Sequence, residues 1–425
     1  MSKPKNNLDI YLHFPFCENK CAYCYINTYK SNPSRNEQYV KALIKEIESI
    51  SEKTEIPIRS VFWGGGSPSL MTHDQLMRIS SAIRNNFNVP QNCVFTIEST
   101  PNEVTDEKIE SYHAVGISRV SVGIQSFNEN VLKAIGRPHT PEIAVNAIHK
   151  LRQQGIRDVC IELMWAIIPF PLETLLDDMK IAAELPIDML TTMWYDIYQK
   201  SNHARRTPLA AKQYEKEFPN NTRNRTDVFA GHQNAFYSID KMIDVFLEAN
   251  DKMSKEGFRR VAIDELRRSN FDIPPGLCLN GPGLSYTDNG GLLGFGYDAL
   301  SSIDNKIHIF NSGLQDYIKN PLSKKNTCFF PPEVLVWYRV IYDIVVPGEF
   351  DLQEYLDFAP SESEELNRWI EHAISQVYFI KTNDTYKLTD KGAAFYNFAF
   401  GVINDLDMAD KVKNIFSKNL PITFQ

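Results

Sequence analysis

The chain has 425 residues, of which 43% are hydrophobic and 12% aromatic, and a net charge of −8. This hydrophobic share can fill a core, which excludes wholesale disorder, and the length allows two or three domains. The acidic balance argues against nucleic acid as a partner, because phosphate binding needs a basic surface. We see no apolar run long enough for a membrane span and no apolar signal segment, so we expect a cytoplasmic protein without a membrane span.

Short apolar runs alternate with helical patterns through the first 200 residues. We expect six strands, at residues 8–14, 59–63, 93–98, 118–125, 159–164 and 188–198. Apolar residues at helical spacing predict helices between them, at 37–50, 76–87, 107–115 and 172–185. Further helical stretches are predicted after the fourth strand, up to residue 155. This alternation is typical of parallel βαβ units with right-handed crossovers, so the predicted fold class is α/β.

The pattern is weaker in the second half. Residues 200–233 are polar and irregular, residues 239–256 again have helical spacing, and residues 276–296 are rich in glycine around one short strand. We expect a long excursion, a helix and a set of loops, in that order.

The last part of the chain has a different character. Helices are predicted at 333–345 and 364–376, followed by two short strands at 377–381 and 385–388 that flank the hairpin signal Asn383-Asp384. Helices followed by a hairpin predict a small, winged-helix-like α+β module.

Three of the seven cysteines lie within eight residues, as Cys17, Cys21 and Cys24. The odd total and the crowding argue against a disulfide framework. Three thiolates in one loop can hold a soft metal site, but structural zinc and complete [4Fe–4S] clusters normally take four ligands. Three cysteines therefore leave one iron open to a substrate or cofactor. The alternatives are zinc completed by a distant residue, or three unrelated thiols.

Five sequence motifs accompany these cysteines in a fixed order. They are YLHFPFC at 11–17, WGGGSPS at 63–69, IESTP at 97–101, VSVGIQSF at 120–127 and GRPH at 136–139. Together with CxxxCxxC they resemble the radical S-adenosylmethionine (SAM) superfamily, and within it the HemN-like, or coproporphyrinogen oxidase-like, subfamily. The resemblance implies a partial TIM-like (β/α)6 barrel over residues 1–200, an extension over 201–329 that completes the barrel and the substrate region, and a winged-helix-like domain over 330–425.

The same resemblance implies a [4Fe–4S] cluster on Cys17, Cys21 and Cys24 and two molecules of S-adenosylmethionine, one of which is cleaved to a deoxyadenosyl radical. The implied cofactor-binding residues are Tyr11, Tyr23, Gly65, Gly66, Ser67, Glu98, Gln125, Arg137 and Glu162, and the implied catalytic residues are Tyr11 and Glu98. Their chemistry is suitable: glycines let backbone approach a ligand, carboxylates at strand ends accept hydrogen bonds, and a guanidinium matches a carboxylate. The alternative is that these residues occupy an ordinary turn, strand end or surface position and bind no cofactor.

The sequence also departs from the subfamily pattern. Tyr25 and Ile26 follow Cys24 where the oxidase has Gly-Cys, and Glu162 replaces an aspartate. Residues 277–280 and Tyr286 lack the His and Trp of the H-N-x-x-Y-W motif of heme-handling relatives. These departures favour a class C methyltransferase that methylates an sp² carbon of an aromatic or conjugated substrate.

Two alternatives remain within the resemblance. One is a tetrapyrrole-modifying enzyme, for coproporphyrinogen decarboxylation or heme degradation, and the other is a non-catalytic heme-trafficking protein. Trp165, Trp194 and Tyr195 suit a flat conjugated substrate or simply fill the core. Cys278 is a candidate substrate contact. We expect a bulky conjugated substrate and an electron donor such as flavodoxin or ferredoxin as partners.

Overall fold

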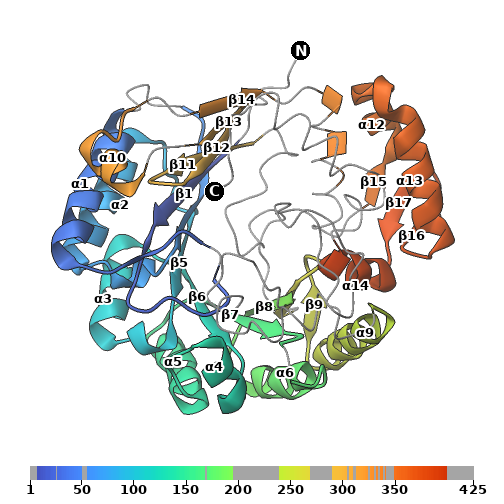
Figure 1. Cartoon of the computed structure of the whole chain (residues 1–425), viewed down its shortest axis with the longest axis horizontal. Coiled ribbons are helices and arrows are strands. Elements are labelled where there is room, and N and C mark those ends of the chain that lie inside the picture. Colours follow the sequence, from blue (N-terminus) through green and yellow to red (C-terminus); the bar gives the residue numbers. More distant parts are fainter. Residues whose placement is uncertain are drawn as a thin grey trace, which may run out of the picture.

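A curved, open sheet organises the protein in the computed structural model. The structure describes residues 7–24, 26–49, 55–167, 170–194, 239–268, 290–303, 306–309, 313–323, 326–329, 332–333, 336–337, 340 and 349–399. Within these residues the sheet has twelve strands in the order β14-β13-β12-β11-β1-β4-β5-β6-β7-β8-β10-β9. Its two ends are different strands, so this part of the chain forms a partial barrel (Figure 1).

The centre of the sheet consists of parallel neighbours in chain order. These are β1 (Leu8–Phe14), β4 (Ile58–Gly65), β5 (Val94–Ser99), β6 (Arg119–Gln125), β7 (Asp158–Trp165) and β8 (Met189–Trp194). All six predicted strands and the α/β class are confirmed. Strand β4 continues two residues further than expected, because Gly64 and Gly65 still pair with His13 and Phe14. The residues predicted beyond Trp194 in the sixth strand lie outside the described residues.

Strands from the second half extend this sheet on both sides. Beside β1 lies β11 (Gly291–Phe295), which is parallel to it, followed by antiparallel β12 (Leu300–Ile303), β13 (Lys306–Ile309) and β14 (Asn326–Phe329). Beside β8 lie antiparallel β10 (Glu265–Arg268) and β9 (Phe258–Arg260). A two-stranded pair, β2 (Phe16–Cys17) with β3 (Tyr29–Lys30), frames the cysteine loop.

Helices follow the central strands on the outside of the curve (Figure 1). They are α1 (Pro33–Ser49), α2 (His73–Asn86), α3 (Asp106–Val115), α4 (Glu129–Ile135), α5 (Pro141–Gln153), α6 (Thr174–Glu184), α9 (Ile239–Lys255) and α10 (Leu314–Lys319), with short 3₁₀ turns at η1 (Pro68–Leu70) and η2 (Pro101–Glu103). Helix α1 starts before the predicted residue 37 because Asn32 Oδ1 accepts the Arg35 N–H, a typical N-terminal cap. A capping box between Thr72 and Gln75 starts α2.

The C-terminal module has its own core. It contains β15 (Glu349–Asp351), α12 (Leu352–Phe358), η3 (Pro360–Glu362), α13 (Ser363–Ser375), β16 (Phe379–Thr382), β17 (Thr385–Leu388) and α14 (Asp390–Ala399). The predicted second helix and the hairpin are confirmed, with Asn383 in the left-handed region at φ 57°. Helix α12 was not predicted, and most of the helix expected at 333–345 lies outside the described residues. The winged-helix likeness stays a prediction, as do the boundaries at residues 200 and 330.

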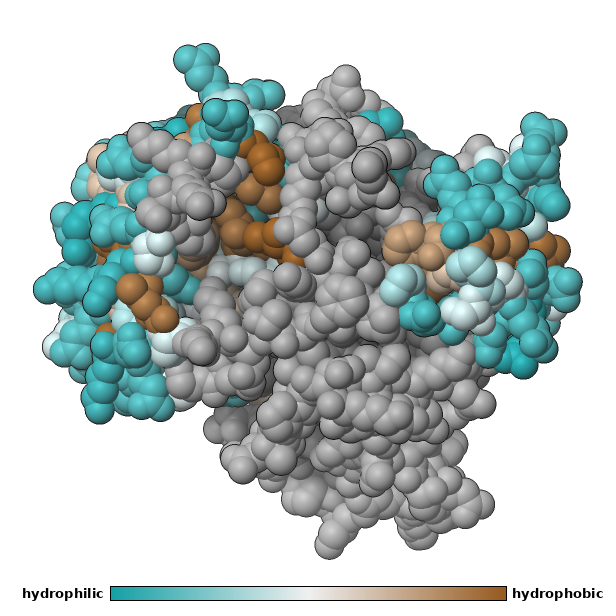
Figure 2. All heavy atoms as spheres, turned by 90° about the horizontal axis from the view of Figure 1, so that it is seen from above, coloured by the Kyte–Doolittle hydropathy of each residue, from teal (hydrophilic) through white to brown (hydrophobic). Residues whose placement is uncertain are grey.

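This module lies across the molecule from β1 and next to α9 (Figure 1). Ile263, just before β10, belongs to its hydrophobic core, and Arg260 forms a 2.7 Å ion pair with Asp390. Figure 2 shows mostly hydrophilic outer surfaces on both described parts, with hydrophobic residues gathered on the sides beside the grey segments. No helix among the described residues has the length and apolar character needed to cross a membrane.

Side chains alternate along the central strands, and this alternation separates a dry face from a polar face. Ile10, Val61, Ile97 and Val120 are fully buried in the main core together with residues of α1 and α2. Burying each such side chain stabilises the fold by about 1.5–3 kcal/mol. The opposite face of the same strands, which lines the inside of the curve, carries a row of polar residues. This row includes Asp9, Tyr11 and His13 on β1, Glu98 on β5, Arg119 and Ser121 on β6, and Asp158 and Glu162 on β7.

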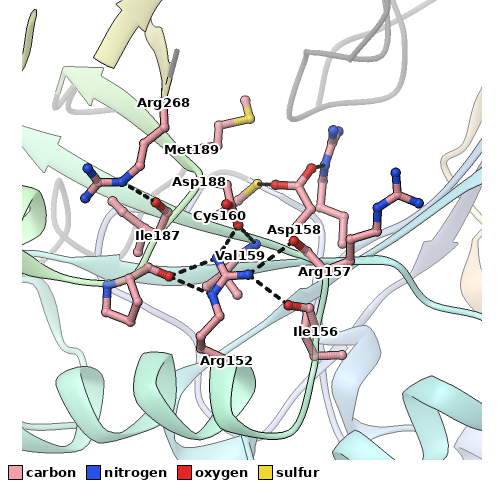
Figure 3. Close-up of polar contacts among 12 residues, drawn as sticks. Arg152, Ile156, Arg157, Asp158, Val159, Cys160, Ile187, Asp188, Met189 and Arg268 are labelled. Carbon is pink, nitrogen blue, oxygen red and sulfur yellow. Dashed lines mark hydrogen bonds and ion pairs between the residues drawn. The ribbon is translucent and has the colours of Figure 1, made fainter. Parts of the chain in front are cut away.

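At the amino ends of the strands the polar residues pair with one another. Asp158 Oδ2 accepts from Arg119 Nε at 2.7 Å and from Arg267 Nη2 at 2.9 Å, and all three residues are buried. Nearby, Arg152 donates to the carbonyls of Pro186 and Ile156 and pairs with Asp188 (Figure 3). These contacts close the base of the barrel by joining β6, β7, β10 and α5.

We expect Asp158→Asn to lower the free energy of unfolding by about 3–5 kcal/mol, because it leaves two buried guanidinium groups without their shared carboxylate. Urea unfolding of the purified variant measures this. Asp251→Asn is the control, because Asp251 forms an exposed ion pair with Lys255 on α9, and its effect should be below about 0.5 kcal/mol. Equal effects of the two substitutions would contradict this account of the barrel base.

Candidate functional site

The candidate site lies at the carboxyl ends of the parallel strands, the end where barrel proteins usually place their active sites. Tyr11, Glu98 and Glu162 are on the inner face of β1, β5 and β7 and are only half-buried. Their outward-facing neighbours Leu12, Ile97 and Ile161 are at most 2% exposed. The inside of the curve is therefore accessible at this end, and the polar side chains there can meet a ligand.

Cys17 is the last residue of β2, and Cys21 and Cys24 lie on the loop that follows it. All three are half-buried free thiols. The Ala22 N–H donates to the Ile135 carbonyl at 3.0 Å, and the Ser31 N–H donates to the Cys17 carbonyl at 2.9 Å. Backbone contacts at both ends thus fix the loop against α4 and β3.

Burial makes the thiols of Cys17 and Cys24 hard to ionise, since it raises the pKa of each. It raises the pKa of Cys17 to about 12, and the neighbouring Cys24 and Cys21 contribute in the same direction, against a hydrogen bond from Ser67. Burial also raises the pKa of Cys24, with Cys21 again contributing. A metal cation would reverse this effect, because a coordinating thiol loses its proton.

Among the described residues, no group of three or more His, Cys, Asp or Glu side chains is gathered closely enough to hold one metal ion. An iron–sulfur cluster does not require such a group, since each thiolate binds a different iron of an extended cluster. The separation of the three thiols therefore fits a cluster better than a single zinc ion.

The glycine loop after β4 connects the cysteines to the carboxylates. Gly65 has φ 111°, and its N–H donates to Glu98 Oε2 at 3.1 Å. The Gly66 N–H donates to the Phe14 carbonyl at 2.8 Å, and a Cβ on Gly66 would lie 2.6 Å from the Phe16 oxygen. Ser67 places its hydroxyl 3.9 Å from the Cys17 sulfur. The glycines are required here by close approach of backbone to backbone.

Two carboxylates face this loop. Burial raises the pKa of Glu98 well above its usual value, and the nearby Glu162 adds to the effect. Ser121 donates to Glu162 Oε1 at 2.9 Å. Two acidic groups held close together in a half-buried site favour a cationic ligand.

Gln125 and Arg137 complete the far side of the site. Gln125, at the end of β6, has φ 75° and is 3% exposed. Arg137 Nη1 donates to the Cys21 sulfur at 3.2 Å, and its Nη2 donates to the Gly123 carbonyl. Gly123 keeps this corner open, since a Cβ there would lie 2.9 Å from Gln125 Nε2 and 3.6 Å from Glu162 Oε2.

Aromatic residues bound the site on two sides. The Tyr11 hydroxyl is hydrogen-bonded to His13 Nδ1 at 2.8 Å, and Tyr11 and Glu98 both lie beside Gly64, where a Cβ would be 3.1 Å from each. Tyr23 packs against the cluster of Val131, Ile135, Met164 and Ile167.

The structure thus brings together all twelve residues predicted from the sequence, through direct contacts or through one shared neighbour. The set is Tyr11, Cys17, Cys21, Tyr23, Cys24, Gly65, Gly66, Ser67, Glu98, Gln125, Arg137 and Glu162. Their individual roles stay predictions. Cys278, Tyr286, Tyr195 and residues 277–280 lie outside the described residues.

Several buried polar atoms in the site have no hydrogen-bond partner within the described part of the chain. They are Gln125 Oε1, Arg137 Nε, His13 Nε2 and His139 Nδ1. Buried polar groups are normally paired, because an unpaired one costs about 1–3 kcal/mol. An acceptor and several nitrogens in need of partners fit a zwitterionic ligand such as S-adenosylmethionine, which has both amino and carboxylate groups.

The sequence did not identify three residues that support the site. His13 lies beside Gly65, and burial lowers its pKa to about 4, so the imidazole is neutral at neutral pH. Ser121 orients Glu162, and Asp178 on α6 accepts from Ser126 Oγ and the Phe127 N–H, both at 2.7 Å. Strand alternation from Tyr11 could have indicated His13, but the contact of Asp178 crosses 52 residues and leaves no local signal.

Trp165 does not line the site. It is 2% exposed and stacks on Phe246 of α9 with 5.8 Å between ring centroids. The alternative of core filling is therefore correct for this residue, and it is excluded as a contact for a flat substrate.

Comparisons with known proteins agree with the geometry. Residues 11–182 match the model of the radical SAM superfamily. The chain is 24% identical over 407 residues to the heme chaperone HemW of Haemophilus influenzae, which covers 92% of this chain and 96% of that protein. It is 23% identical over 403 residues to the heme chaperone HemW of Escherichia coli, with coverage of 92% and 96%.

A solved structure shows the same fold. The coproporphyrinogen III oxidase HemN of Escherichia coli superposes with a TM-score of 0.74 at 20% identity, over 94% of this chain and 91% of that one. The sequence-based resemblance to radical SAM proteins is confirmed. This family implies a [4Fe–4S] cluster and S-adenosylmethionine, as expected from the cysteine motif.

We expect Gly65→Ala to destabilise the protein by about 3 kcal/mol, because alanine at φ 111° is strained and its Cβ would lie 2.8 Å from the His13 ring. Urea unfolding measures the change. Gly155→Ala is the matched control, since Gly155 also has a positive φ, 82°, but open space around it. It should cost about 1 kcal/mol. The account of the loop fails if the control costs as much as Gly65→Ala.

Asp178 should make stability depend on pH. Burial raises its pKa to about 6, above the usual 3.8, with Asp177 contributing in the same direction. The fold therefore favours the protonated form, and stability due to Asp178 is present below pH 4 and lost as the pH rises through 6. The loss amounts to about 3 kcal/mol by linkage. Unfolding at pH 4 to 7 should show a steeper decline for the native chain than for Asp178→Asn; parallel curves would contradict this.

Proposed function

We propose that this chain is a HemN-like enzyme of the radical SAM superfamily that acts on a heme or porphyrin-like tetrapyrrole. The observation that carries the proposal is the extent of the likeness to HemW, which spans 92% of the chain. It continues beyond the radical SAM region of residues 11–182 into the extension and the C-terminal module. The extension over residues 201–329 supplies the substrate region in the predicted domain arrangement.

The residues of the site fit the two cofactors. Cys17, Cys21 and Cys24 would hold the cluster, and the unpaired atoms of Gln125 and Arg137 would bind S-adenosylmethionine. When bound, these cofactors supply one-electron cleavage chemistry, which the protein itself cannot provide. The two carboxylates would accept hydrogen bonds from the ribose or the ammonium group.

The chain's own contribution is to position the groups that meet the ligands. Gly65 orients Glu98, and Ser121 orients Glu162, so both carboxylates are fixed before a ligand arrives. The Tyr11 hydroxyl, hydrogen-bonded to neutral His13, lies at the same edge and would contact the second S-adenosylmethionine or the substrate. An electron donor such as flavodoxin or ferredoxin would supply the electron.

Methyl transfer is the second candidate. Glu162 in place of aspartate and the missing His and Trp near residue 280 favour it, whereas the relatives named above are heme chaperones and an oxidase. The comparisons therefore favour the tetrapyrrole, including heme trafficking without catalysis, over methylation.

One anaerobic experiment separates these functions. The chain is reconstituted with iron and sulfide, reduced with dithionite and incubated with S-adenosylmethionine and either heme or coproporphyrinogen III. Deoxyadenosine together with a modified tetrapyrrole would support the proposal. S-adenosylhomocysteine would indicate methyl transfer, stoichiometric heme binding without deoxyadenosine would indicate trafficking, and absence of all three would overturn the proposal.

We expect Cys21→Ala to lose the cluster and all formation of deoxyadenosine. The cluster needs all three thiolates of this loop, and the substitution leaves two. Iron and sulfide analysis with the visible spectrum measures the cluster. Cys93→Ala is the control, since Cys93 is also a half-buried free thiol but packs against the main core. It should retain the cluster. A full cluster in Cys21→Ala would refute the assignment of the ligands.

A further inference from the structure

We infer that Arg137 raises the reduction potential of the cluster through a charge-assisted hydrogen bond to the Cys21 sulfur. This role is additional to the predicted binding of S-adenosylmethionine, and it rests on the proposed function, since it requires a cluster on Cys17, Cys21 and Cys24. Arg137 would change the potential at which the cluster itself takes up one electron.

The guanidinium of Arg137 is fixed at two points. Nη1 donates to Cys21 Sγ at 3.2 Å, and Nη2 donates to the carbonyl of Gly123 on β6. Both donors belong to one rigid planar fork, so a single side chain connects the Cys21 sulfur to β6.

Backbone contacts bring the two residues together without the guanidinium. Helix α4 ends at Gly136 in the left-handed region, and the Arg137 N–H donates to the Leu132 carbonyl at 2.9 Å. The Ala22 N–H, one residue after Cys21, donates to the Ile135 carbonyl at 3.0 Å. The end of α4 and the cysteine loop are therefore joined by main chain, and substitution of the Arg137 side chain leaves that joint in place.

Cys21 differs from Cys17 and Cys24 in the group that donates a hydrogen bond to its sulfur. Cys17 has the neutral Ser67 hydroxyl at 3.9 Å, and Cys24 has a backbone donor at Ile26. Among the described residues, Cys21 is the one motif cysteine whose sulfur accepts a hydrogen bond from a charged group. Glu162 and Tyr23 face Arg137, and Lys20 lies near Cys24.

The charges of the oxidised and reduced cluster determine the direction in which Arg137 shifts the reduction potential. A cluster that takes one electron from a low-potential donor becomes more negative by one charge, and no covalent bond forms or breaks. A cation in hydrogen-bond contact with a ligand sulfur stabilises the more negative state, and hydrogen bonds to the sulfurs are among the factors that set cluster potentials. Arg137 should therefore make reduction of the cluster by a low-potential donor easier.

The test is a redox titration of the reconstituted full chain with dithionite, followed by electron paramagnetic resonance. S-adenosylmethionine is omitted, so that a role of Arg137 in binding it does not contribute. In Arg137→Gln the equilibrium constant for reduction should fall at least tenfold, which equals a shift of about 59 mV for one electron. Arg137→Lys keeps the charge without the fork and should lie between Arg137→Gln and the native chain.

Lys133→Gln is the matched control, because Lys133 is on α4, which ends just before Arg137, and its ion pair with Glu129 is exposed. Its potential should equal that of the native chain. An unchanged potential in Arg137→Gln with an intact cluster would overturn the inference. Loss of the cluster from both Arg137 variants, with the fold retained, would also overturn it, since Arg137 would then be needed for assembly. Failure of the native chain to assemble a cluster would instead overturn the proposed function.

Discussion

The alternation of side chains along parallel strands is the constraint on which the rest of the structure depends. Apolar residues such as Ile10 and Val120 must face the helices, so every second residue must face the inside of the curve. In this chain many of those residues are polar, and Tyr11, Glu98 and Glu162 lie on this inner face of β1, β5 and β7. The position of the site is therefore a consequence of how the core is built.

The polar groups at the two ends of this face differ in whether they have hydrogen-bond partners. At the base, Arg119, Asp158 and Arg267 pair with one another, so their charges are compensated within the chain. At the open end, Gln125 and Arg137 keep buried atoms without partners among the described residues. Buried polar groups left unpaired cost free energy that a ligand can recover. This contrast between the two ends separates a structural charge network from a binding site.

Much of this could be predicted from local sequence, and the remainder depends on contacts between distant segments. Strand periodicity predicted β1 and β4 to β8, and the Asn383-Asp384 signal predicted the hairpin, because both are governed by neighbouring residues. The pairing of Asp158 with Arg267 spans 109 residues, and no spacing rule reaches that far. The cysteine motif indicated a cluster, but the contact of Arg137 with Cys21 spans 116 residues and required the fold.

Charge balance links the open end to the kind of ligand it can accept. Ionised cysteines with Glu98 and Glu162 leave the site strongly negative, and Arg137 supplies one positive charge against them. Burial raises the cost of such an excess, as the raised pKa values of Glu98 and Cys17 show. Cations that enter the site would stabilise the ionised forms of these groups. Iron on the thiolates and a sulfonium or ammonium group beside the carboxylates would meet this need together, and so the acidic character of the site and its cysteine motif support the same pair of cofactors.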